Sequence, residues 1–161
     1  MKVTFTKTAA RRYRVSVEGP GIAPSWMEPA PGYDDQLPHD MAHFVVENEL
    51  GISGGVFGQL AQGGHGRTFH TEDIQHKRKL GRRGDRIAAG NRDDTNLSET
   101  VVAIACQAWN KKISGASQIK GVSPERIKQI CGVFDTVSAV WSKLAIGESM
   151  TLEWRGKERK K

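Results

Sequence analysis

Residues 37–51 hold the side chains of this chain whose types and spacing are best suited to chemistry. They include His39 and His43, four positions apart, together with Asp40 and Glu47. On an α-helix this spacing places the two imidazoles on one face, one turn apart and about 6 Å along the axis. The four side chains then share roughly a quarter of the helix circumference, with no Lys or Arg among them. Two imidazoles in this arrangement can hold a divalent transition metal such as zinc.

The stretch His39-Asp40-Met41-Ala42-His43 resembles the H-E-x-x-H motif of metallohydrolases, with Asp in place of Glu. In that motif the Glu is a general base, and the shorter Asp has less reach toward a metal-bound water. We expect Asp40 or Glu47 to serve as a base, or Glu47 to hold an imidazole in place. A third ligand is expected from one of the remaining histidines, which are His65, His70 and His76.

Two metal-free interpretations of the same histidines remain open. In one, His39 or His43 works with a carboxylate as a metal-free site. In the other, the pair hydrogen-bonds to neighbouring loops, and Asp40 complements the positive end of the helix dipole.

The longer segment LPHDMAHFVVENELGISGGVFGQLAQGG, about a sixth of the chain, resembles a recurring segment of small uncharacterised bacterial proteins. Its form there is L-P-H-D-x-x-H-F-V-V-E followed by a glycine-rich turn. The resemblance implies a bacterial, cytoplasmic protein and no particular activity. The N-terminus MKVTFTKTAARR agrees with this expectation, because it lacks the apolar core of a signal peptide. No apolar run is long enough for a transmembrane helix, so we expect no membrane partner.

The charge of the chain is unevenly distributed along its 161 residues, which carry a net charge of +6. Residues 15–63 contain seven acidic side chains and no Lys or Arg, whereas residues 155–161 contain five basic side chains and one acidic. An acidic stretch that carries the histidine pair suits a metal cation or another positively charged ligand. Two cysteines exclude a disulfide framework and a four-cysteine zinc site.

Residues 64–97 are rich in Gly and charge and poor in large apolar side chains, so a mobile basic loop with one weak helix near 71–79 is predicted. Its cations include Lys77, Arg78, Lys79, Arg82 and Arg83. Such a run can follow a phosphate backbone, which makes a nucleic-acid-binding or regulatory accessory protein using residues 77–86 an alternative function. No known nucleic-acid-binding signature accompanies it. A third alternative is a protein-interaction module without catalysis, whose polar helix face meets a basic partner.

Hydrophobic periodicity predicts the elements that must position these groups. Residues 2–6 and 12–18 alternate like a strand hairpin, residues 150–154 like a third strand, and residues 19–37 form a Pro- and Gly-rich ordered loop. Helices are expected over 38–50, 53–61 and 98–111 and from residue 123, with Ser98 and Ser123 as N-caps. The result is a single α+β domain over 1–154, a small antiparallel sheet against about four helices, before a disordered basic tail at 155–161.

Overall fold

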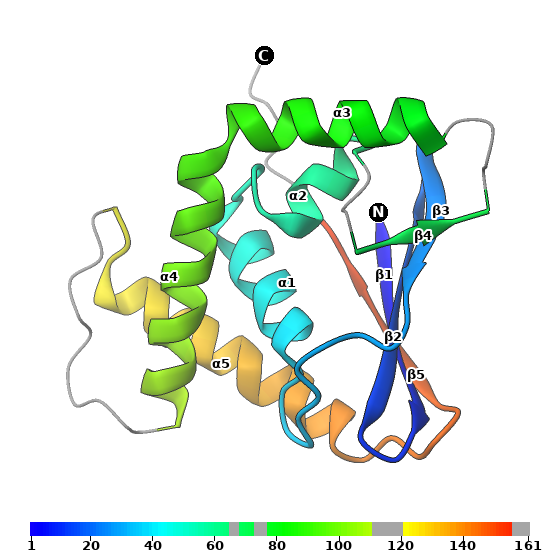
Figure 1. Ribbon diagram of the computed structural model, residues 1–161. Helices are drawn as coiled ribbons and strands as arrows, with labels where there is room; N and C mark the ends of the chain where they lie inside the picture. The colour runs from blue at the N-terminus through cyan, green and yellow to red at the C-terminus, as the bar shows by residue number, and fades with distance from the viewer. Residues whose placement is uncertain (65–67, 73–76, 111–120, 156–161) are drawn as a thin grey trace.

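The computed structural model describes residues 1–64, 68–72, 77–110 and 121–155. They form an α+β fold in which α1, α4 and α5 lie on one side of a five-stranded antiparallel sheet (Figure 1). The strand order is β4-β3-β2-β1-β5. The strands are β1 (Lys2–Ala9), β2 (Arg12–Gly19), β3 (Ile22–Met27), β4 (His70–Thr71) and β5 (Ser149–Glu153). The predicted fold class is confirmed.

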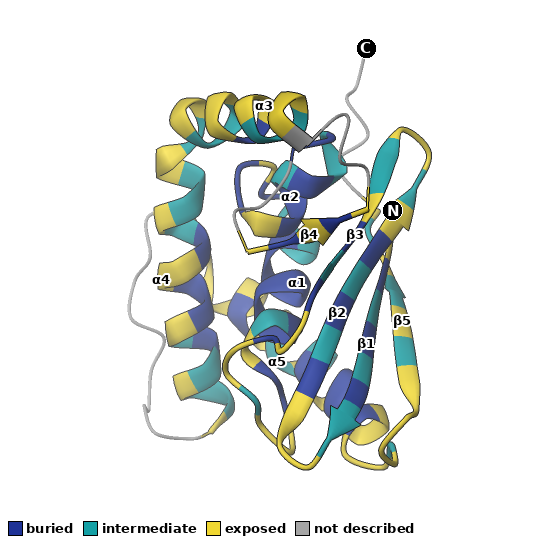
Figure 2. Cartoon of the chain, turned by 45° about the vertical axis from the view of Figure 1, so that its right-hand side comes forward, coloured by how far each residue is buried: buried dark blue, intermediate teal, exposed yellow. Residues whose placement is uncertain are grey.

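The N-terminal hairpin and the C-terminal strand pair as the sequence predicts. Phe5 of β1 lies between Val15 of β2 and Met150 of β5. Alternate residues of β1 and β2 are buried (Figure 2). Val3 and Tyr13 have no exposed surface. These side chains supply the sheet's share of the core, because successive residues of a strand point to opposite faces.

Strand β3 corrects the prediction of a loop over 19–37. The prolines of this segment argued against a strand, because proline cannot donate to the hydrogen-bond ladder. Pro24 lies at an irregularity of the pairing with β2, between the partners of Val17 and Gly19, where no regular ladder bond is formed. The carbonyl of Pro24 instead accepts a hydrogen bond from the Thr71 hydroxyl at 3.0 Å.

Helix α1 (His39–Leu50) is central and contacts three other helices. It begins directly after Pro38 and ends at Gly51, whose φ of 63° lets the Ile52 amide bond to the Glu47 carbonyl. The other helices are α2 (Val56–Ala61), α3 (Lys77–Gly90), α4 (Arg92–Trp109) and α5 (Pro124–Trp141). As predicted, Ser123 caps α5.

Helix α3 corrects the prediction of a loop over 64–97. The low content of large apolar residues in this segment predicted a loop. Leu80, Gly84 and Ile87 nevertheless recur at helical spacing. Gly84 is buried, and the packing is tight because a Cβ at Gly64 would lie only 3.2 Å from the Ile87 side chain. Helix α4 then begins at residue 92, which places Ser98 inside the helix and overturns its prediction as an N-cap.

The described helices include none that is both long and apolar enough to cross a membrane. Of the predicted basic tail, the structure describes only Arg155, whose backbone amide donates to the Asn48 side chain at 2.9 Å. Residues 156–161 lie outside the described residues.

Candidate metal centre

Helix α1 turns its polar groups inward. Its residues from Met41 to Glu47 are all buried, including His43 at 3% exposure and Glu47 at 0%. His39, one turn before His43, keeps about half of its side chain exposed. A buried imidazole and a buried carboxylate need partners, because an unpaired polar group in a protein interior costs roughly 1–3 kcal/mol in mutational data.

Glu47 finds its partners at the start of α2. Its carboxylate accepts hydrogen bonds from the amides of Val56, Phe57 and Gly58 at 3.0, 2.8 and 3.4 Å. These amides have no partners within their own helix, and the positive end of the helix dipole favours an anion there. The carboxylate reaches them over Gly55, where a side chain would overlap it.

Ser98 of α4 connects Glu47 to His43. Its hydroxyl donates to Glu47 Oε1 at 3.0 Å, and its oxygen lies 3.2 Å from His43 Nδ1. Since the hydroxyl has one proton and gives it to Glu47, it must accept from an Nδ1–H of His43. This relay selects the tautomer of a neutral His43 in which Nε2 carries the lone pair.

The Nε2 atom of His43 is buried and has no hydrogen-bond partner among the described residues. The nearest charged group is Glu99 Oε2 of α4, at 3.5 Å. The His39 ring lies beside the His43 ring, with the two ring centroids 4.5 Å apart. A metal-ligating histidine usually has one ring nitrogen free to bind the metal, while the N–H of the other ring nitrogen donates a hydrogen bond that fixes the ring.

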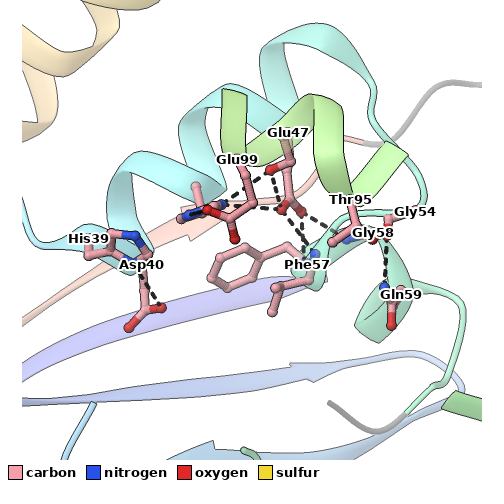
Figure 3. A network of polar contacts seen from close by, with 12 residues as sticks. His39, Asp40, Glu47, Gly54, Phe57, Gly58, Gln59, Thr95 and Glu99 are labelled. Carbon is pink, nitrogen blue, oxygen red and sulfur yellow. Dashed lines mark hydrogen bonds and ion pairs between the residues drawn. The ribbon is translucent and has the colours of Figure 1, made fainter. Parts of the chain in front are cut away.

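His39, His43 and Glu99 together form a three-ligand cluster. Their ligand atoms lie within 4.8 Å of one another, close enough for one ion to contact all three. Figure 3 shows His39 of α1 and Glu99 of α4 in this region. The donors are two imidazole nitrogens and one carboxylate oxygen, a set that suits zinc and other divalent transition metals. Because His39 and Glu99 are exposed, the cluster opens to solvent on one side.

The charges around His43 also favour a cation at Nε2. Burial alone lowers the pKa of His43, but the neighbouring acidic groups, foremost Glu47 and Glu99, raise it more, so the pKa lies above its ordinary value. A proton and any metal ion bound there would compete for the same lone pair.

Asp40 is bound through Oδ2 to Tyr13 of β2, while its Oδ1 lies 4.0 Å from His39 Nδ1. The phenol oxygen lies 2.5 Å from Asp40 Oδ2 and 2.6 Å from the Pro31 carbonyl oxygen. Burial raises the pKa of Asp40 above its ordinary value, and a protonated Asp40 would let both short contacts be hydrogen bonds. Asp40 thereby ties the start of α1 to the sheet and to the loop before it.

The structure thus brings together only some of the predicted site residues. His39 and His43 converge. The Glu47 carboxylate binds the amides of α2 and Asp40 Oδ2 binds Tyr13, and the catalytic roles of these two residues stay predictions. His70 lies on β4 against Trp26 and is not part of the cluster. His65 and His76 lie outside the described residues.

Sequence reasoning missed Glu99 as a candidate third ligand and Ser98 as the link to His43. Both come from α4, more than 50 residues after His43, in a stretch whose apolar pattern predicts only a buried helix. No local spacing marks either residue.

The chain matches no protein-family model, no curated protein and no solved structure. Its function must therefore be inferred from the chemistry of the site itself.

Proposed function

We propose that this protein binds a divalent transition metal such as zinc through His39, His43 and Glu99. The observation that carries the proposal is the buried, unpartnered Nε2 of His43, whose opposite ring nitrogen is held by Ser98. The two other ligands sit on different helices, His39 on α1 and Glu99 on α4, so the bound ion would join them.

A water molecule or another small molecule from solvent can reach the proposed metal site. His39 is half exposed and borders a pocket of about 400 Å³ that also includes Tyr33 and Trp109. Three protein ligands leave a fourth position open, as in catalytic zinc sites, where the metal lowers the pKa of a bound water.

Hydrolysis stays a prediction from the motif, because none of the carboxylates first assigned as bases is free beside the ligands. Glu47 is fully buried under the amides of α2, and Asp40 is bound to Tyr13. The geometry therefore favours metal binding without naming a reaction. A cytoplasmic location likewise stays a prediction.

Metal content and zinc titration of protein purified without a histidine tag test the proposal. Glu99→Gln and His39→Gln should each weaken zinc binding at least about tenfold. Loss of a residue that merely supports a ligand already costs about tenfold or more in metal affinity, and these variants remove ligands themselves. Both positions are exposed, so neither variant should unfold the protein.

His70→Gln is the matched control, since it removes a histidine outside the cluster. Its zinc affinity should equal that of the unmodified protein. No saturable binding of zinc or another divalent transition metal, or an equal loss in the His70 variant, would overturn the proposal.

A further inference from the structure

Helix α3 concentrates positive charge. It contains six of the chain's cations and a single acidic residue, Asp85, a formal charge of +5 within 14 residues. Its exposed cations are Arg78, Lys79, Arg82, Arg83 and Arg86. Figure 1 shows α3 at one end of the molecule, beyond α2 and against the end of α4.

The exposed cations share one side of the helix. Arg78, Arg82 and Arg86 recur every four residues, which on an α-helix aligns them along one face. The apolar side chains of Leu80 and Ile87 lie on the opposite side, where buried Gly84 packs against Gly64. The basic face therefore points to solvent because the other face is used for packing. Arg83 lies at the border of the two faces, with its guanidinium 3.4 Å from where a Cβ at Gly63 would stand.

The basic face brings like charges close together along the helix. Arg78, Arg82 and Arg86 are four residues apart, and like charges at that spacing repel one another and destabilise a helix. A polyanion would relieve this repulsion. The cations are mostly arginine, whose planar guanidinium binds phosphate through two hydrogen bonds.

We propose that this face of α3, formed by Arg78, Lys79, Arg82, Arg83 and Arg86, binds the phosphate backbone of a nucleic-acid duplex without sequence preference. A duplex fits better than a single strand, because none of the aromatic side chains needed for base stacking lies on α3. The contact is independent of the metal cluster, which lies on α1 and α4.

Fluorescence anisotropy of a labelled duplex tests this proposal on the full chain. The triple variant Arg78→Gln, Arg82→Gln, Arg86→Gln should bind at least about tenfold more weakly at low salt. The slope of log affinity against log salt should become shallower by about 0.9 for each phosphate that the variant no longer neutralises. Circular dichroism should show an intact helix, since the substitutions remove like-charge pairs.

The control is Arg12→Gln, Lys128→Gln, Lys143→Gln, which removes the same charge from exposed positions on β2 and around α5. It should keep the affinity and the salt slope of the unmodified protein. Absence of duplex binding at low salt, or equal weakening in both variants, would overturn the proposal. So would binding to phosphatidylserine vesicles or to single strands in preference to the duplex.

Discussion

Gly55 lies directly against the carboxyl group of Glu47. A Cβ at position 55 would stand 2.2 Å from the carboxyl carbon, far inside contact distance. The backbone of Gly55 has φ −73° and ψ 180°, which any residue can adopt. The glycine is therefore needed for the space that its missing side chain leaves to Glu47.

Gly55→Ala should destabilise the protein by about 1–3 kcal/mol, the usual cost of overpacking a buried site. The added methyl group must displace the Glu47 carboxylate, which then loses its bonds to the α2 amides. Urea unfolding measures the change. Gly132→Ala is the control, because a Cβ there meets nothing within 4 Å and alanine favours a helix by about 0.5–1 kcal/mol. Equal effects at the two positions would contradict the role of Gly55.

Ser98→Ala should lower zinc affinity about 10–100-fold, as removal of a residue that orients a ligand typically does. Without the hydroxyl, the Nδ1–H of His43 has no acceptor, and the tautomer with a free Nε2 is no longer selected. Zinc titration gives the affinity, and long-range ¹H–¹⁵N NMR of the His43 ring in metal-free protein gives the tautomer.

Ser138→Ala is a matched control for Ser98→Ala, because Ser138 is a buried serine that bonds to Gln36 instead. It should leave both the affinity and the His43 ring signals unchanged. An unchanged His43 tautomer in Ser98→Ala would show that Ser98 does not select the tautomer, whether or not the site binds metal.

Zinc affinity should fall as the pH decreases, beginning above the ordinary histidine pKa of 6.5. The pKa of His43 is raised, because its neighbouring carboxylates outweigh the effect of burial. The proton therefore competes with the metal at higher pH than it would at an exposed histidine, and binding releases that proton. Titrations in buffers of different ionisation enthalpy count the protons released. A pH-independent affinity would contradict competition at Nε2.

The sequence predicted the histidine pair because a helix encodes it locally. A Pro before His39 and a Gly after Leu50 mark the two ends of the helix. The four-residue spacing places the two imidazole rings side by side. Glu47 was expected to hold an imidazole, and it does so only through Ser98, since its carboxylate lies 3.8 Å from His43 Nδ1.

The remaining parts of the site and fold depend on contacts between distant segments. Glu99 becomes a candidate ligand because α4 packs against α1, and nothing near it in the sequence marks that contact. Similarly, α3 is stabilised by packing around Gly64 and Gly84, which composition alone cannot reveal. Local sequence patterns therefore predicted most helices and strands, whereas the contacts between distant segments became visible only in the three-dimensional structure.

Asp40→Asn should change stability in a pH-dependent way. Burial raises the pKa of Asp40 in the folded state, so the native protein holds this proton more tightly than the unfolded chain does. The stability that this proton supplies is fully present below the unfolded value of 3.8 and is lost as the pH rises through the raised native pKa. Asn, which mimics the neutral acid and donates to the Tyr13 oxygen, avoids that loss. The stability of Asp40→Asn relative to the unmodified protein should therefore increase from about pH 4 to about pH 7.

Urea unfolding at several pH values measures this difference directly, because contributions from other titrating groups are common to both proteins. Asp35→Asn provides the comparison, since its carboxyl group is exposed and accepts a hydrogen bond from the nearby Tyr33 hydroxyl. A constant stability difference across the range would mean that Asp40 is ionised in the folded protein. In that case the Tyr13 hydroxyl must donate to Asp40, and the short contact with the Pro31 carbonyl would be an unrelieved repulsion between two acceptors.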